Sequence, residues 1–177
     1  TINEDTSVMI SLTGTDVDDN SSLTYTVTIA PEHGTIEQNG SMLSYTPDLN
    51  YNGTDSLSYI ANDGELDSED GEILVQINAI NDSPELSSIG ALSFTEDGSL
   101  VHELSSVDVD SGELTYSITG GTDITASLDG STITFTSTLD YNGSEEFEVS
   151  VSDLEFTDSE TITVSVLSAN DPLVVPQ

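Results

Sequence analysis

The chain has 177 residues, 34 of them Asp or Glu and none Lys or Arg, so its formal net charge is −34. A polyanion of this kind is repelled by phosphate backbones and by anionic membrane surfaces, which excludes nucleic acid and such membranes as expected partners. There is no Cys, so no disulfide framework can form, and no apolar run approaches the roughly 18 residues that would predict insertion into a membrane.

The predicted elements are short strands, because apolar residues recur at every second position between clusters of Gly, Asn, Asp and Pro. In the first half the expected strands are Ser7–Leu12, Leu23–Ile29, Gly34–Glu37, Met42–Tyr45, Ser56–Ala61 and Glu72–Ala79. In the second half they are Ala91–Thr95, Leu100–Leu104, Leu114–Thr119, Ile124–Leu128, Thr132–Thr136, Glu145–Val151 and Glu160–Leu167. No window has helical periodicity. About seven short strands in about 90 residues predict an immunoglobulin-like β-sandwich.

An internal repeat divides the chain into two copies. LNYNGTDSLSYIAND, from Leu49, matches LDYNGSEEFEVSVSD, from Leu139, and INDSP matches ANDP near the end of the second copy. Each copy has about 90 residues, a usual size for a domain. We therefore predict an all-β protein of two tandem Greek-key β-sandwich domains, residues 1–82 and 83–177, in an elongated arrangement.

Acidic and amide side chains are expected to converge where the first domain continues into the second. In a seven-strand sandwich the A–B and E–F turns lie at one end of a domain, and the B–C and F–G turns lie at the other. Assigning the turns of both copies in this way places eight candidate ligands near the connection: Glu4, Asn50, Asn52, Asn81, Asp82, Asp108, Asp110 and Asp153.

These candidates are all oxygen donors, and nearby carboxylates repel one another strongly unless a cation compensates them. Without Lys or Arg, a bound metal ion is the natural compensation. Calcium accepts six to eight oxygen ligands in flexible geometry, whereas magnesium retains several waters, so the sequence predicts calcium. The alternative is that these are ordinary turn residues, since Asp and Asn also favour turns for local reasons.

The order of these motifs resembles cadherin repeats, and it is more closely similar to the cadherin-like tandem repeats of large bacterial surface adhesins. NED at the start, VDVD, LNYNG or LDYNG, VSD and the Asn-Asp before proline carry the resemblance. In cadherins the corresponding groups bind calcium between domains. Asn50 and Asn52 stand where that family has acids, and Ala79 stands where its linker has a further Asp, so the resemblance implies one or two ions per junction.

Two incomplete sets of the same residues lie at the outer ends of the pair. Asp16, Asp18 and Asp63 belong to the first copy, and Glu96, Asp140 and Asp171 belong to the second. Each set would be completed only by another repeat.

The resemblance implies a secreted or cell-surface adhesin repeat, in which calcium stiffens a rod-like stalk used in cell adhesion and biofilm formation. Its partners would be neighbouring repeats of the same long chain. The alternative is a calcium-dependent module that recognises polysaccharide or a like repeat. We expect no enzyme activity, because the chain has no Trp and no Cys and offers no plausible Ser/His/Asp set for nucleophilic catalysis.

Overall fold

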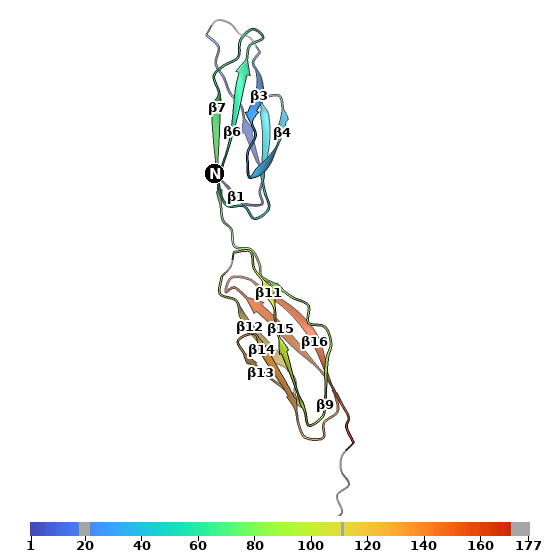
Figure 1. Ribbon diagram of the computed structural model, residues 1–177. Coiled ribbons are helices and arrows are strands. Elements are labelled where there is room, and N and C mark those ends of the chain that lie inside the picture. The colour runs from blue at the N-terminus through green and yellow to red at the C-terminus, as the bar shows by residue number, and fades with distance from the viewer. Residues whose placement is uncertain (18–21, 111, 171–177) are drawn as a thin grey trace, which may run out of the picture. The chain divides into compact units, whose positions relative to one another are not determined.

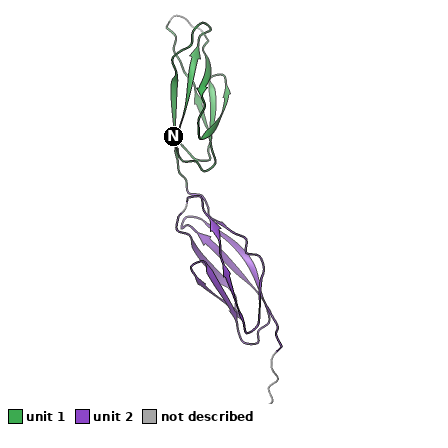
Figure 2. Ribbon diagram, in the orientation of Figure 1, with its two compact units in different colours: residues 1–80 green, residues 81–177 purple. Residues whose placement is uncertain are grey.

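The computed structural model describes residues 1–17, 22–110 and 112–170 (Figure 1). The chain divides into two compact units, Thr1–Ile80 and Asn81–Gln177 (Figure 2). Every regular element in the described ranges is a β-strand, which confirms the all-β, tandem-domain prediction. Within these ranges no helix is long and apolar enough to cross a membrane. The domain boundary after Asp82 stays a prediction.

Unit 1 is a sandwich of two sheets with the strand orders β1-β7-β6-β3 and β2-β5-β4. β1 pairs with β7 in parallel, whereas the other pairs of unit 1 are antiparallel. The described strands are β1 (Ile2–Asn3), β2 (Val8–Ser11), β3 (Thr24–Ile29), β4 (Gly34–Asn39), β5 (Met42–Pro47), β6 (Gly53–Asn62) and β7 (Gly71–Asn78).

Unit 2 repeats this plan with the orders β12-β15-β16-β9 and β10-β14-β13, and adds a short β11-β8 pair. β9 pairs in parallel with β16, as β1 does with β7. The described strands are β8 (Glu85–Leu86), β9 (Leu92–Thr95), β10 (Ser99–Glu103), β11 (Ser106–Val107), β12 (Thr115–Gly120), β13 (Ile124–Asp129), β14 (Thr132–Ser137), β15 (Gly143–Ser152) and β16 (Thr157–Leu167).

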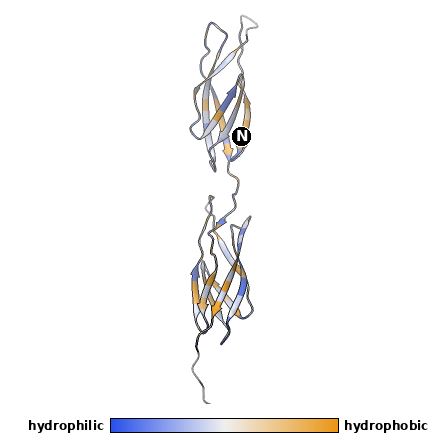
Figure 3. Ribbon diagram, turned by 90° about the vertical axis from the view of Figure 1, so that its right-hand side faces the viewer, coloured by the Kyte–Doolittle hydropathy of each residue, from blue (hydrophilic) through white to orange (hydrophobic). Residues whose placement is uncertain are grey.

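Each unit has its own hydrophobic core between its sheets, because alternate residues of a strand point to the same face. Figure 3 shows the resulting alternation of hydrophobic and hydrophilic positions along the strands. In unit 1 the buried cluster is Leu43, Tyr45, Leu57, Val75 and Ile77. In unit 2 it is Leu86, Phe94, Leu104, Ile124, Ile133, Phe135, Phe147, Val149, Val151, Ile162, Val164 and Val166.

The turns that carry candidate ligands repeat the same backbone conformation in both units. Asp5 and Asp97 have φ of 58° and 60°, and Asn50 and Asp140 have φ of 58° and 57°. Asn and Asp adopt this left-handed region more readily than most other non-glycine residues. Backbone geometry therefore supplies a local reason for these residue types.

Candidate metal-binding site

The five predicted ligands of unit 2 lie together and are joined by hydrogen bonds. The Asn81 side-chain amide donates to Asp153 Oδ2 at 2.6 Å, and the Asp82 backbone N–H donates to Asp110 Oδ2 at 2.6 Å. The Asp110 N–H donates in turn to Asp108 Oδ1 at 2.9 Å. Turns far apart in the sequence thus converge at the end of unit 2 where its chain begins.

Asp108 contributes a buried oxygen that the described residues do not satisfy. Its Oδ2 atom is buried and has no hydrogen-bond partner among the described residues. Buried polar atoms are nearly always paired, and an unpaired carboxylate oxygen is especially costly. A cation would supply the missing partner.

Asp153 is held in its ionised form by the groups around it. The Asn81 amide and the N–H groups of Phe156 and Glu155 keep the pKa of its carboxyl below the ordinary value, against a smaller opposing effect of burial. Oδ1 accepts the two backbone N–H groups, at 2.6 Å from Phe156 and 2.8 Å from Glu155. Asp153 therefore fixes the β15–β16 turn through one oxygen and holds Asn81 through the other.

In unit 1, Glu4 lies at the end from which the chain leaves. The parallel β1–β7 pairing carries Glu4 alongside the end of β7, where its N–H donates to the Asn78 carbonyl at 3.0 Å. Its side chain is only 4% exposed, and Oε1 accepts the Ile80 N–H at 2.6 Å. Glu96 repeats this arrangement in unit 2: it is 7% exposed, and Ala169 N–H donates to its carboxylate.

The two turns of unit 1 that carry the other candidates also meet. The Asn50 N–H donates to Asp5 Oδ1 at 2.9 Å, while the Asn52 side chain is exposed just before β6. Asp5 is not among the ligands predicted from the sequence. The repetition of Glu-Asp as Glu4-Asp5 and Glu96-Asp97 could have identified it.

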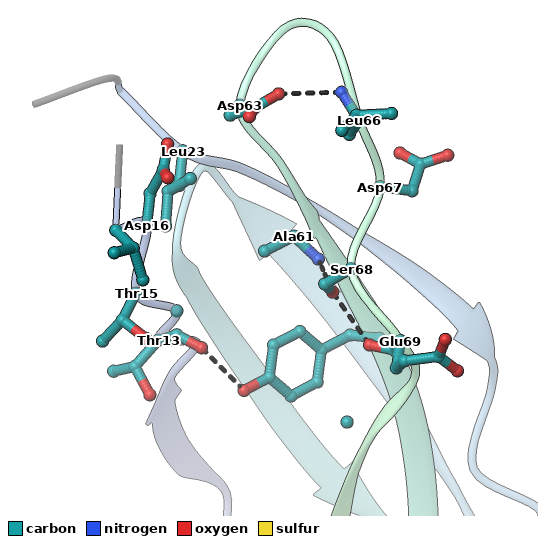
Figure 4. Close-up of a pocket in the computed structure, with 14 residues that line it drawn as sticks. Thr13, Thr15, Asp16, Leu23, Ala61, Asp63, Leu66, Asp67, Ser68 and Glu69 are labelled. Carbon is teal, nitrogen blue, oxygen red and sulfur yellow. Dashed lines mark hydrogen bonds between the residues drawn. The ribbon is translucent and has the colours of Figure 1, made fainter. Parts of the chain in front are cut away.

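The opposite end of unit 1 carries the corresponding incomplete set. Asp16 and Asp63 line a hollow of about 410 Å³ together with Asp67 and Glu69 (Figure 4). Asp63 Oδ1 accepts the N–H groups of Glu65 and Leu66, the same turn bonds that Asp153 makes in unit 2. Asp18 and Asp171 lie outside the described residues. Asp140 is exposed.

The fit to a metal ion rests on the types of donor and on the orphaned Asp108 oxygen. Across the described ranges, no three His, Asp or Glu side chains stand close enough together to hold an ion without adjustment. In unit 2 the carboxylates are linked through backbone N–H groups and the Asn81 amide. A calcium ion would require these side chains to turn toward it, with carbonyl and amide oxygens completing the six to eight ligands.

Two other acidic residues, Asp55 and Glu145, have a clear structural role that the sequence did not predict. Asp55 is 4% exposed and accepts the N–H groups of Glu32 and His33, each at 3.0 Å, and the Tyr45 hydroxyl at 2.8 Å. Glu145 accepts the N–H groups of Thr122, Asp123 and Ile124 in unit 2. The alternation along the strand could have identified Asp55, because Asp55 and buried Leu57 are two residues apart and therefore lie on the same face.

The fold and the acidic turns define a class of protein, the cadherin-like and immunoglobulin-like tandem repeats. The family model described as "bacterial Ig domain" matches twice, over residues 1–76 and 81–165. The chain therefore belongs to the bacterial Ig domain family.

Solved structures of similar fold include the EC1-2 fragment of human mucin-like protocadherin, 18% identical with a TM-score of 0.56, where the match covers 95% of this chain and 94% of that one. Form II of human protocadherin-24 EC1-2 is 19% identical with a TM-score of 0.55, covering 86% and 85% of the two chains. These likenesses confirm the cadherin-like fold.

Two further matches involve small parts of larger proteins. An integrin beta-like protein B from Dictyostelium discoideum is 39% identical over 59 residues, which is 33% of this chain and 3% of that protein. An endo-fucoidan hydrolase from glycoside hydrolase family 107 is 22% identical with a TM-score of 0.39, covering 96% of this chain and 28% of the hydrolase chain. The chain thus spans a minor part of each.

Proposed function

We propose that this chain is a calcium-binding repeat of an extracellular adhesin, in which calcium held beside the linker stiffens a rod-like stalk used in cell adhesion and biofilm formation. The observation that supports this most is the convergence of Asn81, Asp82, Asp108, Asp110 and Asp153 in unit 2, with Asp108 Oδ2 buried and without a hydrogen-bond partner in the part of the chain that the structure describes. Calcium suits this all-oxygen donor set.

Unit 1 would contribute Glu4 to the same ion or to an adjacent one. Its carboxylate accepts the N–H of Ile80, the residue directly before Asn81. Asn50 and Asn52 would add amide or backbone oxygens from the neighbouring turn. Stiffening follows because an ion with ligands on both sides of a linker restricts the dihedral angles of the residues between them.

The net charge gives an independent reason for a bound cation. With 34 acidic residues and no Lys or Arg, self-repulsion opposes the compact state at low ionic strength. An ion that binds the folded chain stabilises it in proportion to the logarithm of its concentration. Extracellular modules bind calcium with dissociation constants of about 10⁻⁴ to 10⁻³ M, which matches an extracellular setting.

The first test is thermal unfolding with calcium and with chelator, using a matched pair of variants. Asp153→Asn and Asp63→Asn remove equivalent turn carboxylates, one in each unit. Of the two, only Asp153 contacts Asn81 beside the linker. At a calcium concentration of about 100 times the dissociation constant, binding should stabilise the wild type by about 2.7 kcal/mol. Asp63→Asn should retain most of this gain, and Asp153→Asn should lose most of it.

Small-angle X-ray scattering then tests the stiffening. On calcium addition the scattering signature of interdomain flexibility should disappear in the wild type and persist in Asp153→Asn. If neither melting temperature nor scattering responds to calcium, the acidic residues are turn residues only. Retention on polysaccharides that chelator abolishes would instead support the alternative of a calcium-dependent binding module.

A further inference from the structure

Each unit has a seam where edge strands of its two sheets lie without pairing to each other. In unit 1 these edge strands are β3 and β4, and in unit 2 they are β12 and β13 (Figure 1). Edge strands expose backbone N–H and C=O groups that can pair with another chain, and natural proteins usually protect them. The two units differ in this protection.

In unit 1 the seam is closed by a side chain and interrupted by a bulge. The Gln38 side-chain amide donates to the Tyr25 carbonyl of β3 at 2.8 Å and to the Gly40 carbonyl at 2.9 Å. The pairing of β3 with β6 also shifts register between Val27 and Ile29. An added strand would have to displace Gln38 and could not continue a regular ladder past the bulge.

In unit 2 the edge strand β12 has neither the glutamine bond nor the register shift. Leu128 occupies the place of Gln38, since Leu128 pairs with Ile133 as Gln38 pairs with Leu43, and leucine has no group to donate to the Tyr116 carbonyl. β12 pairs with β15 in unbroken register from Thr115 to Gly120. The strand reads TYSITG, without charge or proline. Its outer edge therefore presents a regular ladder.

A hollow beside this edge could receive a side chain of an added strand. It measures about 550 Å³, and Leu114, Tyr116 and Leu128 form its apolar walls. Strand addition commonly combines these two features, with main-chain hydrogen bonds supplying affinity and a pocket for alternate side chains supplying specificity. The feature thus fits an extended peptide with an apolar residue at alternate positions.

The surrounding charge identifies the chemistry of the partner. Glu113 and Asp129 are sequence neighbours of residues that line the hollow. Exposed Glu148 lies on the adjacent strand β15, where it pairs with Thr119 of β12. A second copy of this chain could bring no Lys or Arg to this surface, because the chain contains none, so it could not neutralise these acids with either residue. We propose that β12 binds an extended, basic segment of a different protein as an added strand.

Hydrogen–deuterium exchange with a defined peptide tests this proposal. The probe is a capped eight-residue peptide that alternates Lys and Val, used at about 0.15 M salt to limit nonspecific attraction. Backbone amides of β12 should exchange more slowly with the peptide, and those of β3 should not change. A control peptide with proline in place of one central Val cannot form a continuous strand and should bind at least about tenfold more weakly.

A matched pair of variants then tests the role of the seam residue. Leu128→Gln installs the protection seen in unit 1 and should weaken peptide binding by about fivefold, the equivalent of one modest hydrogen bond that must be displaced. Gln38→Leu should leave binding at β12 unchanged.

Three results would overturn the proposal. They are equal binding of the proline peptide, protection spread evenly over both units, and self-association of the chain through β12 in place of peptide binding. If Leu128→Gln does not fold, the exchange pattern of the wild type with the two peptides decides the matter.

Discussion

Asp55 in unit 1 and Glu145 in unit 2 perform the same task with different chemistry. Each carboxylate lies near the start of a long strand, β6 or β15, and by accepting backbone N–H groups it anchors the loop before β4 in unit 1 and before β13 in unit 2. In unit 1 it also accepts the hydroxyl of the fully buried Tyr45. In unit 2 the matching core residue is Phe135, which needs no partner.

These two sites show how the chain satisfies its carboxylates without Lys or Arg side chains. Backbone N–H groups take the place of Lys and Arg, so a buried acid becomes a structural element instead of a liability. In unit 1 the Asp55 carboxylate at 2.8 Å and the His33 carbonyl at 3.2 Å both accept the hydroxyl of buried Tyr45. The two positions therefore form a coupled pair, Tyr45 with Asp55 and Phe135 with Glu145.

The largest expected effect comes from removing the anchor in each unit. Asp55→Ala should destabilise unit 1 by about 3 kcal/mol, because it leaves several N–H groups without their acceptor and the buried Tyr45 hydroxyl with only its longer bond to the His33 carbonyl, at 3.2 Å. Glu145→Ala should destabilise unit 2 by less, since no buried hydroxyl depends on it. Urea unfolding with separate probes for the two units measures both.

The double variant Tyr45→Phe/Asp55→Ala is the control for this comparison. It should recover part of the loss, because the buried hydroxyl that had lost its carboxylate acceptor is gone. Equal destabilisation by Asp55→Ala and Glu145→Ala would contradict the coupling of Tyr45 with Asp55.

The pH dependence of stability should show the same coupling with a smaller effect. Burial alone would raise the pKa of Asp55, but the hydrogen bonds from Glu32, Tyr45, His33 and Ser56 outweigh it and hold the pKa below its ordinary value. A carboxyl whose pKa is lowered by folding stabilises the protein above its unfolded pKa of about 4, and this stability is lost as pH falls through the folded pKa.

Tyr45→Phe removes one of those hydrogen bonds and should bring the folded pKa of Asp55 closer to the unfolded value. The variant should therefore be less stable than the wild type by about 1 kcal/mol at neutral pH, and the two should converge on acidification. Urea midpoints at a series of pH values measure this difference, which also cancels the repulsion among the remaining acids. A difference independent of pH would mean that Tyr45 acts through packing alone.

Strand positions were largely predictable from the sequence because period-two alternation marks both a strand and its buried face. Every predicted strand overlaps an observed one. The strands missed were β1, β8 and β11, each of two residues, which is too short to show alternation. β1 matters nonetheless, because its parallel pairing with β7 buries Glu4 beside Ile80.

The candidate site was predictable where turns repeat and less so where side chains act singly. Repetition identified Asp108, Asp110 and Asp153, which the structure brings together with Asn81 and Asp82. Asp55 lies just before the expected strand Ser56–Ala61, whereas the observed strand begins at Gly53 and places Asp55 on its buried face. Which acids bind an ion and which only cap N–H groups depends on distances that sequence spacing does not contain.

The smallest expected effect comes from exchanging Asn50 and Asp140, which occupy matching turns with φ of 58° and 57°. Both residue types accept this conformation, so the substitutions change charge with little backbone strain. Asn50→Asp should destabilise unit 1 and Asp140→Asn should stabilise unit 2, each by less than about 0.5 kcal/mol.

Because the cause is repulsion among acids, both changes in stability should vanish at about 0.5 M salt. Melting temperatures at low and high salt measure them, and a salt-independent change above about 1 kcal/mol would indicate backbone strain instead. With calcium present, Asn50→Asp should reverse its sign, because the added carboxylate would then serve as a ligand.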